Sequence, residues 1–304
     1  MKKIISIVTI NFNSENETHQ CLSSLFEIDH KDFDVKIIVV DNGSKEIFKL
    51  TKAEQEKDVF LIRSDINLGF SGGNNLGISK ALGSGSDYVL IINNDTYHDK
   101  NFLKELFTVL EKSKSAGAAV PKIYFAKGHE FHKNRYKNLE LGKVFWYAGG
   151  FMDFKNALSV HRGVDEVDKG QYDVQETVDF ATGCCILFKR EVLEKVGLFD
   201  DRYFLYFEDA DLSMRIIKSG FNIMYVPSAF IWHINAASSG VGSTLQDYFI
   251  TRNRLLFGFT YGNFRLRFAL YRESMRILFF GRLWQKLAIR DFYFKKFEKG
   301  SWGK

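Results

Sequence analysis

The densest group of residues that can do acid–base chemistry is Glu208, Asp209 and Asp211, which follows an aromatic stretch ending at Phe207. Three carboxylates within four positions suit the first turn of a helix, because the helix dipole favours negative charge there. Aromatic walls beside paired carboxylates can also raise one pKa toward the working range of a general base. The cluster therefore predicts either an acidic helix cap or a catalytic base, with Glu208 and Asp209 as the candidates.

A second polar group, Asn93-Asn94-Asp95, directly follows an apolar run at 88–92. A hard carboxylate oxygen such as that of Asp95 can hold Mg²⁺ or Mn²⁺ against a diphosphate. His233 follows another short apolar run and can be a metal ligand or a structural histidine. The triplet predicts a divalent-metal site or, alternatively, a helix-capping turn.

Polar residues also end the first two apolar runs, at Asn11 and Asp41. The Asp41 carboxylate can accept hydrogen bonds from a ribose hydroxyl or a base N–H, or it can cap the next helix. The glycine-rich segment 67–75 can let backbone N–H groups approach a nucleotide, or it can allow close helix packing. It matches neither a dinucleotide fingerprint nor a P-loop. Its candidate nucleotide-binding residues are Asn67, Gly69, Gly72 and Asn75.

The scaffold that must position these residues is predicted from the first 125 residues. Apolar runs rich in Ile and Val at 4–10, 35–40, 59–62 and 88–92 alternate with helix-like segments. Runs that are apolar at every position are typical of parallel strands buried on both faces. The alternation predicts a doubly wound α/β sheet with its ligands at the carboxyl ends of the strands.

Three helix starts are predicted from capping residues. Ser14 and Glu17 have the spacing of a capping box for a helix that runs to about residue 26. Ser71 can cap a helix that ends near Leu82, and Asp99 can cap the helix after the Asn-Asn-Asp triplet.

The rest of the chain divides into regions of different pattern. Periodicity fades at 126–176, which we interpret as an insertion of loops and not as a domain. Strand and helix patterns return by residue 178, and the region after 240 is helical, aromatic and basic. We therefore expect a catalytic domain over 1–240 and a helical appendage over 241–304.

The composition is that of a soluble globular protein. The chain has 304 residues, of which 45% are hydrophobic and 26% are charged, so disorder and a disulfide-stapled miniprotein are excluded. It contains no run of 18 apolar residues that would predict a membrane span. Cys184 and Cys185 are adjacent and Cys21 falls in a predicted helix, so we expect reduced thiols and a cytoplasmic protein.

The formal net charge of +5 is unevenly distributed, because residues 262–304 contain 11 Lys and Arg but 3 Asp and Glu. Arg265, Arg272 and Arg276 would share one helical face. This pattern predicts an interfacial helix on an anionic leaflet, or a helix that packs on the catalytic domain or a second subunit. It does not favour nucleic acid, because the charge lies on a short helix and not in a broad groove. The apolar residues beside the arginines are Phe264, Phe268, Tyr271, Met275 and Leu278.

Taken together, these residues resemble glycosyltransferase family 2, the inverting nucleotide-sugar transferases with the GT-A fold, and especially its rhamnosyltransferase-like members. The resemblance covers roughly residues 4–260 and rests on seven motifs in order, each weak alone. They are Val8-Thr9-Ile10-Asn11-Phe12-Asn13, Val39-Val40-Asp41-Asn42-Gly43-Ser44, Asn67-Leu68-Gly69-Phe70-Ser71-Gly72-Gly73-Asn74-Asn75, Asn93-Asn94-Asp95, Thr182-Gly183-Cys184-Cys185, Phe204-Leu205-Tyr206-Phe207-Glu208-Asp209-Ala210-Asp211-Leu212 and Arg252-Asn253.

The resemblance implies a role for several residues. Asp41 would contact the nucleobase, Asp209 would be the catalytic base, and Glu208 would support or position the acceptor. Residues 93–95 stand where the family's Asp-x-Asp triplet binds metal and diphosphate.

The triplet departs from the family pattern at its first position, which is Asn93 in this chain. Asp95 is therefore expected to be the main ligand of Mg²⁺ or Mn²⁺, with His233 as the second protein ligand. Asn94 would lie beside the same diphosphate.

The implied activity is transfer of L-rhamnose from dTDP-rhamnose to a glycan or lipid-linked glycan of a bacterial surface polysaccharide. A UDP-sugar donor, carrying a hexose or galactofuranose, is the alternative. Peripheral contact with the inner face of the plasma membrane through 262–304 and a homodimer are both compatible with this reading.

Two other classes of protein are weighed against a sugar transferase. A nucleotidyltransferase normally has a basic, glycine-rich loop after its first strand, and residues 11–15 contain no basic residue. A non-catalytic glycan-assembly subunit would not need the carboxylates of Asp95 and Asp209.

Overall fold

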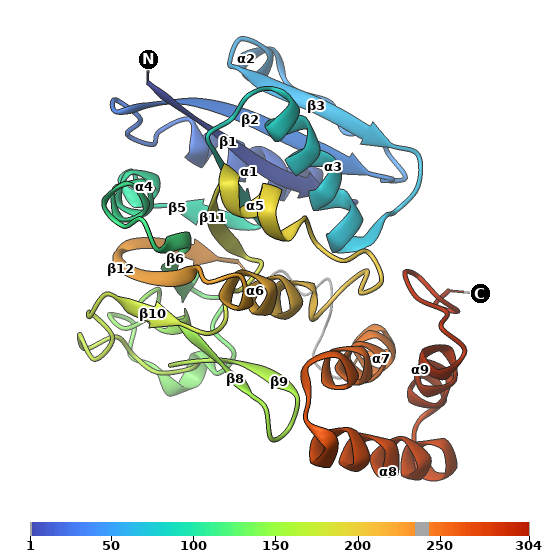
Figure 1. Cartoon of the computed structure of the whole chain (residues 1–304). Coiled ribbons are helices and arrows are strands. Elements are labelled where there is room, and N and C mark those ends of the chain that lie inside the picture. Colours follow the sequence, from blue (N-terminus) through green and yellow to red (C-terminus); the bar gives the residue numbers. More distant parts are fainter. Residues whose placement is uncertain (1, 235–242, 304) are drawn as a thin grey trace.

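One large mixed sheet organises the computed structural model, which describes residues 2–234 and 243–303 (Figure 1). Its strands are hydrogen-bonded in the order β10-β12-β6-β11-β4-β1-β2-β3, with β5 paired to β12 and β7 paired to β6. The strands are β1 (Lys3–Asn11), β2 (Phe33–Asn42), β3 (Val59–Ser64), β4 (Tyr88–Ile92), β5 (Thr96–His98), β6 (Ala116–Phe125), β7 (Phe145–Tyr147), β10 (Glu176–Val178), β11 (Cys185–Lys189) and β12 (Asn222–His233).

The N-terminal half of the sheet is parallel, which confirms the predicted strand pattern. β1 pairs in parallel with β2 and β4, and β2 pairs in parallel with β3. The register places Asn11 beside Asp41 and Asp41 beside Arg63. The carboxyl ends of these strands therefore meet at one edge, as the doubly wound arrangement requires.

The other half makes the sheet mixed. β11 is antiparallel to both of its neighbours, β4 and β6, whereas β12 runs parallel to β6. In Figure 1, α3 lies in front of β1 and β2, and α1 lies behind them. The helices of this part are α1 (Glu15–Leu25), α2 (Lys52–Gln55), α3 (Gly69–Gly83), α4 (Phe102–Lys112), α5 (Arg190–Val196) and α6 (Glu208–Lys218).

Glycines allow α3 to approach the sheet closely. A Cβ atom at Gly77 would lie 2.3 Å from Val8 Cγ1, and one at Gly73 would lie 2.9 Å from Ile10 Cδ1. Such distances are far below van der Waals contact, so any larger residue would push the helix away from β1. The helix-packing role of the glycine-rich segment is thus present in the structure.

Of the three predicted cap residues, Ser14 does precede its helix α1, which ends at Leu25 as expected, but none of the three caps a helix with its side chain. The Ser14 hydroxyl does not cap α1, because it accepts a hydrogen bond from Asn94 Nδ2 at 2.7 Å. α3 begins two residues before Ser71, and α4 begins at Phe102. Asp99 Oδ1 accepts the N–H of the residue that precedes Phe102 at 2.8 Å, in a turn before α4. The side chains of Ser14 and Asp99 thus bind other partners than the free N–H groups of a helix. The Ser71 hydroxyl is buried without a hydrogen-bond partner among the described residues.

The 126–176 region adds short elements around the main sheet. It contributes β7, a 3₁₀ turn η1 (Lys133–Arg135), and a hairpin of β8 (Gly150–Asp153) and β9 (Leu158–His161). The predicted helical region follows as α7 (Thr244–Tyr261), α8 (Phe264–Phe280) and α9 (Leu283–Tyr293), drawn at the lower right of Figure 1.

All three cysteines are buried free thiols, as the sequence predicts. Among the helices of the described residues, none combines the length and the hydropathy needed to cross a bilayer.

Candidate active site

A hydrogen-bond network joins the ends of β1 and β2 to the polar triplet after β4. Asn11 Nδ2 donates to Asp41 Oδ1 at 3.3 Å, and Asn11 Oδ1 accepts from the Thr18 hydroxyl at 2.9 Å. Asn94 Nδ2 donates to the same Thr18 hydroxyl at 2.8 Å. The structure therefore brings Asn11, Asp41 and Asn94 together, as the candidate nucleotide-binding residues require.

Asp41 is fully buried and strongly hydrogen-bonded. It accepts a hydrogen bond from the Phe48 N–H at 3.1 Å and forms an ion pair with the Arg63 guanidinium. Burial alone would raise the pKa of this carboxyl, but hydrogen bonds from Ser44, Phe48, Asn11 and Arg63 outweigh burial and lower it. The group is therefore a fixed anion and a hydrogen-bond acceptor at neutral pH.

Sequence reasoning missed Arg63 as a partner of Asp41. In the sequence, Arg63 is visible only as a single cation after the apolar run 59–62. The sequence does not give the register of this strand against β2, so the partner of Arg63 could not be predicted. In the parallel pair β2 and β3 the two residues are direct neighbours.

The polar groups at the start of the glycine-rich segment form hydrogen bonds within the chain. Asn67 Oδ1 accepts the Gly69 N–H at 2.8 Å. The N–H groups of Phe70 and Ser71 donate to the Phe204 carbonyl at 2.6 and 3.3 Å. Two of the N–H groups that were expected to face an anion are thus used to hold a neighbouring loop.

Gly72 and Asn75 lie toward that same loop region. Asn75 Nδ2 donates to the Phe199 carbonyl and to Asp201 Oδ1, both at 2.8 Å. Asn75 Oδ1 accepts the Phe199 N–H at 2.9 Å. A Cβ atom at Gly72 would lie 3.7 Å from Asp201 Oδ1. These contacts fix α3 against the segment that leads to the acidic cluster.

Asp95 and His233 converge from two strand ends. His233 Nε2 lies 3.1 Å from Asp95 Oδ1. The histidine is buried, and its Nδ1 has no hydrogen-bond partner among the described residues. The ring of Trp146, from the 126–176 region, meets the His233 ring at 4.6 Å and 72°. Sequence reasoning missed this tryptophan, because no local pattern relates β7 to the end of β12.

The pair fits part of a divalent-metal site. A carboxylate oxygen and an imidazole nitrogen are suitable ligands for Mn²⁺, and Mg²⁺ commonly binds one or two protein carboxylates together with substrate phosphates. Over residues 2–234 and 243–303, no group of three or more His, Cys, Asp or Glu side chains is arranged to hold a metal. Substrate phosphate and water are the further ligands that such a site commonly uses.

Asp209 and Glu208 occupy the first turn of α6 with different environments. Asp209 Oδ2 accepts the Gly183 N–H at 2.9 Å, and Oδ1 accepts the Ala210 N–H at 2.8 Å. Burial raises the pKa of Asp209 to about 6, although these hydrogen bonds oppose the shift. Burial and the charge of Asp209 raise the pKa of Glu208 well above its usual value. Of the two carboxyls, Asp209 is therefore the first to lose its proton as the pH rises, and its charge then opposes ionisation of Glu208.

The segment between β10 and β11 connects the candidate base to the metal pair. Gly183 donates its N–H to Asp209, and the next residue, Cys184, accepts the Asn93 N–H at 2.9 Å. Two adjacent residues thus contact α6 on one side and the triplet that contains Asp95 on the other. The candidate base and the candidate metal ligand lie at the same edge of the sheet.

The loop that leads into α6 has an unusual backbone. Phe204, Tyr206 and Phe207 have φ values of +64°, +68° and +72°, in the left-handed region that side chains rarely adopt. Each such residue costs of order 1–3 kcal/mol and persists only where the surroundings fix it. The strained loop places Glu208 and Asp209 at its end.

Arg252 and Asn253 of α7 supply that fixation. The Asn253 side-chain amide donates to the carbonyls of Tyr203, Leu205 and Tyr206, each at 2.8 Å. Arg252 donates to the Arg202 and Tyr203 carbonyls at 3.0 and 2.9 Å, and both α7 side chains are fully buried. The sequence showed this dipeptide as a motif but not its role, since its partners are backbone atoms.

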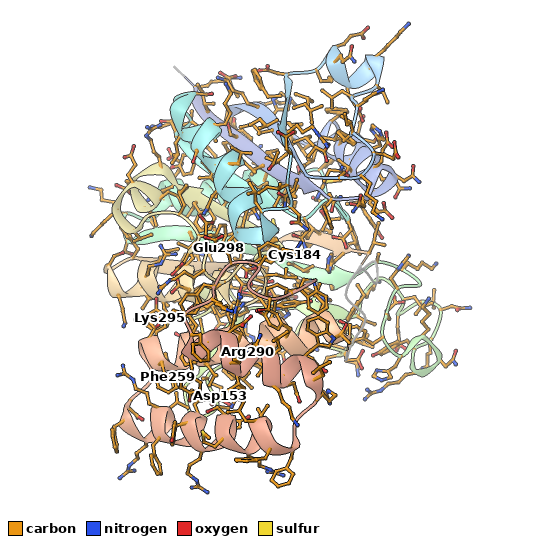
Figure 2. The ribbon with its side chains drawn as sticks, turned by 90° about the vertical axis from the view of Figure 1, so that its right-hand side faces the viewer. Asp153, Cys184, Phe259, Arg290, Lys295 and Glu298 are labelled. Atoms are coloured by element: carbon orange, nitrogen blue, oxygen red, sulfur yellow. The ribbon has the colours of Figure 1, made fainter. Side chains whose placement is uncertain are left out.

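The C-terminal segment completes the same contact. Arg252 Nη1 donates to the Glu298 carbonyl at 2.6 Å, and the Glu298 N–H donates to the Arg202 carbonyl at 3.1 Å. Figure 2 labels Glu298 above α9, where the chain turns back toward the catalytic domain. The helical region is thus built into the site-bearing loop.

Comparison with known proteins identifies the family. The profile described as Glycosyl transferase family 2 matches residues 6–197. An N-acetylglucosaminyl-diphospho-decaprenol L-rhamnosyltransferase of Mycobacterium tuberculosis is 26% identical over 249 residues, covering 79% of each chain. A dTDP-rhamnosyl transferase RfbF of Shigella flexneri is 23% identical, covering 84% of this chain and 80% of the relative. A low-salt glycan biosynthesis hexosyltransferase, Agl10 of Haloferax volcanii, is 26% identical, covering 83% and 74%.

A solved structure supports the fold. The crystal structure of GalNAc-T7 with UDP, GalNAc and Mn²⁺ superposes with a TM-score of 0.61 at 16% identity, covering 90% of this chain and 55% of that one. The fold is therefore GT-A, with a helical region after it. Two of the relatives are named as rhamnosyltransferases. Since the family profile matches residues 6–197, which is more than half of the chain, the protein belongs to glycosyltransferase family 2.

Proposed function

We propose that this glycosyltransferase moves a sugar from a nucleotide diphosphate to a glycan hydroxyl with inversion, and that the donor is dTDP-L-rhamnose. The observation that carries the proposal is the link from Asp209 through Gly183 and Cys184 to the triplet that contains Asp95. Asp209 is a carboxylate base whose pKa is raised by burial, and the candidate metal ligands Asp95 and His233 lie at the same edge of the sheet. This combination suits the displacement of a diphosphate. Two relatives named as rhamnosyltransferases support the choice of sugar.

In this proposal Asp209 takes the proton of the acceptor hydroxyl as that oxygen attacks the anomeric carbon. The bond from the anomeric carbon to the diphosphate oxygen breaks in the same step, and the nucleoside diphosphate leaves with the bonding electrons. One displacement inverts the anomeric configuration. General-base assistance of this kind contributes about 10²- to 10⁴-fold to the rate.

Protonated Glu208 would act as a hydrogen-bond donor toward the acceptor, because its buried Oε2 has no partner among the described residues. Asp95 and His233 would hold Mg²⁺ or Mn²⁺, which stabilises the negative charge of the leaving diphosphate when it is bound. Asp41, with Asn11 beside it, would accept a hydrogen bond from the nucleobase. The amides of Asn93 and Asn94, with Asn67, Gly69, Gly72 and Asn75, complete the proposed donor side.

The proposed acceptor is a glycan or lipid-linked glycan of a bacterial surface polysaccharide. The Mycobacterium tuberculosis relative is named for a diphospho-decaprenol acceptor, which is lipid-linked. The proposal includes a cytoplasmic enzyme in peripheral contact with the inner face of the plasma membrane through 262–304, where such an acceptor lies. A homodimer remains compatible with it.

A UDP-sugar donor is the second candidate. One relative is named a hexosyltransferase, and the superposed GalNAc-T7 structure contains UDP. A non-catalytic glycan-assembly subunit is disfavoured, because a protein without turnover would have no use for the paired carboxylates of Glu208 and Asp209.

A thermal-shift panel tests the proposal. Purified protein is heated with dTDP-, UDP- and GDP-sugars, each with and without Mn²⁺, since a ligand that binds only the native state raises Tm. We expect dTDP-rhamnose with Mn²⁺ to give the largest increase. A larger increase with a UDP-sugar would select the alternative donor. No increase with any nucleotide sugar would overturn the assignment of the donor site.

A further inference from the structure

The exposed face of α8 carries a stripe of aromatic side chains. Phe264, Phe268, Tyr271 and Phe279 are 83%, 53%, 47% and 70% exposed. Their spacing of four, three and eight residues keeps them on one side of a helix that turns about 100° per residue. We refer to these four residues as the aromatic stripe.

The opposite face of α8 is the one that packs on the protein. Leu266, Leu270 and Ser274 are buried, and Ser274 hydrogen-bonds to the Tyr293 hydroxyl of α9 at 2.8 Å. A Cβ atom at Gly258 of α7 would lie 2.2 Å from Leu270 Cδ1, so α7 and α8 are in close contact. The sequence left open whether the aromatic face packs on the catalytic domain. The structure shows that a different face of α8 is the packed one, and that it packs on α7 and α9.

Positive charge flanks the aromatic stripe. Arg265, Arg272 and Arg276 are exposed along one side of it, and Arg267 is exposed on the other. None of these four arginines forms an ion pair with a described residue. The one acidic residue of α8, Glu273, is paired with Arg254 of α7 at 2.7 Å and lies toward the packed side. The outer face is therefore aromatic and cationic, with no carboxylate of its own helix.

Helix α8 also lies at the outer limit of the molecule. In Figure 1 it runs along the lower edge, below α7 and α9. Figure 2 shows its side chains projecting downward, away from the rest of the chain. At its end Phe280 and Leu283 are 85% and 76% exposed, which extends the apolar surface to the turn before α9. A flat surface can meet the whole length of this helix without contact with the sheet.

We propose that the outer face of α8 docks in the plane of an anionic lipid bilayer, with the aromatic stripe in the headgroup region and the flanking arginines on acidic headgroups. Aromatic side chains favour the headgroup boundary, and unpaired arginines complement anionic lipid. In a two-fold dimer through this face, the four arginines of one copy would face the four arginines of the other. Repulsion between these cations opposes self-association. This inference extends the membrane contact of the proposed function but rests on exposure and charge alone.

Vesicle cosedimentation of the full chain tests the inference without any activity readout. One set of vesicles contains neutral phosphatidylcholine alone. The other contains phosphatidylcholine with about 30% phosphatidylglycerol, which is anionic. We expect binding to the anionic vesicles at least about tenfold tighter than to neutral ones, and weaker binding at high salt because ions screen the charges.

Two sets of variants separate the aromatic and cationic contributions. F264S/F268S/F279S should lower binding about tenfold or more, whereas F60S/F131S/F151S, which removes three phenylalanines exposed by 42%, 48% and 46% elsewhere, should bind like wild type. R265Q/R272Q/R276Q should lose the preference for anionic lipid. K112Q/K114Q/K155Q removes equal charge from exposed positions elsewhere and should retain it.

Sedimentation velocity supplies the opposing outcome. The wild type could be a dimer that binds no vesicles and that the F264S/F268S/F279S substitutions dissociate. This result would assign the aromatic stripe to an interface between two copies of the chain and overturn the inference. Equal vesicle binding by both phenylalanine variants would overturn it as well. A protein that binds a nucleotide sugar in the thermal-shift panel but binds no vesicle would refute the docking surface and the proposed membrane contact, and would leave the proposed sugar transfer intact.

Discussion

Asn253 in α7 donates a hydrogen bond from its side-chain amide to the carbonyl of Tyr203, at 2.8 Å and fifty residues earlier in the chain. The same amide reaches the carbonyls of Leu205 and Tyr206. One buried side chain therefore fixes the strained loop that ends at Asp209. The helical region predicted as an appendage contributes to the geometry of the candidate base.

Replacement of Asn253 by Ala should lower kcat and leave the affinity for the donor unchanged. The change leaves buried carbonyls without a donor, which costs about 1–3 kcal/mol each, and it frees a strained loop next to the base. We expect kcat to fall at least about tenfold, because small displacements of a catalytic group are costly. Donor affinity is measured by the thermal shift with nucleotide sugar, and stability by urea denaturation.

Leu255→Ala provides the matched control for this variant. Leu255 is a buried residue of α7, and its truncation should destabilise the protein by about 2–5 kcal/mol. If kcat falls equally in both variants at 20 °C, loss of stability alone explains the result and Asn253 does not position the base.

Asp209→Asn should reduce turnover by about 10²- to 10⁴-fold, since it removes the base but keeps the shape of the side chain. The amide oxygen can still accept the Gly183 N–H that Asp209 now accepts. We therefore expect the nucleotide sugar to raise Tm as it does for the wild type. Near-normal turnover of the variant would assign the base to another residue.

The pH dependence of kcat/KM should show the pKa of Asp209. Burial raises that pKa to about 6, and the base acts only when it is deprotonated. Activity should therefore be low below pH 6, rise through it, and level off above it. Burial and the charge of Asp209 raise the pKa of Glu208, so Glu208 loses its proton after Asp209. The small residual activity of Asp209→Asn should lack the rise near pH 6, and a wild-type rise near pH 4 would contradict a buried base.

Loss of Asp95 should weaken metal binding more than loss of an exposed carboxylate. We expect Asp95→Ala to raise the Mn²⁺ concentration needed for half-maximal stabilisation with dTDP by at least about tenfold, because it removes the only carboxylate of the proposed metal pair. His233→Ala should produce a smaller change in the same direction. Asp34→Asn, at an exposed position on β2, is the control. Identical Mn²⁺ titrations for all four proteins would place the metal elsewhere.

The parallel half of the fold was predictable because it is governed by local patterns. The run Tyr88–Ile92 is apolar at every position and Ile4–Ile10 is apolar except at Ser6 and Thr9, and the structure places them in strands β4 and β1. The polar residues that follow those runs then meet at one edge as a consequence of topology. Asn11, Asp41 and Asn94 were found in this way.

The contacts that fix the candidate base were not predictable, because they depend on distant backbone atoms. Nothing near Phe204 in sequence indicates that its carbonyl accepts the N–H groups of Phe70 and Ser71. The side-chain cap predicted for Ser14 is absent for a related reason, because its hydroxyl accepts a hydrogen bond from Asn94, 80 residues later in the chain. The types of side chain were enough to predict a candidate acid–base and metal site, but the hydrogen bonds that position those side chains come from residues distant in sequence.

The hydrogen bonds between Arg202, Arg252 and Glu298 have a consequence for biosynthesis. A ribosome delivers Glu298 after the sheet, α6 and α7, so the last of these contacts forms only near the end of synthesis. We expect ribosome-bound chains that end before residue 298 to recognise nucleotide sugar but to transfer the sugar more slowly than the full chain. The rate of transfer would then rise as synthesis passes this residue, without a separate activation event.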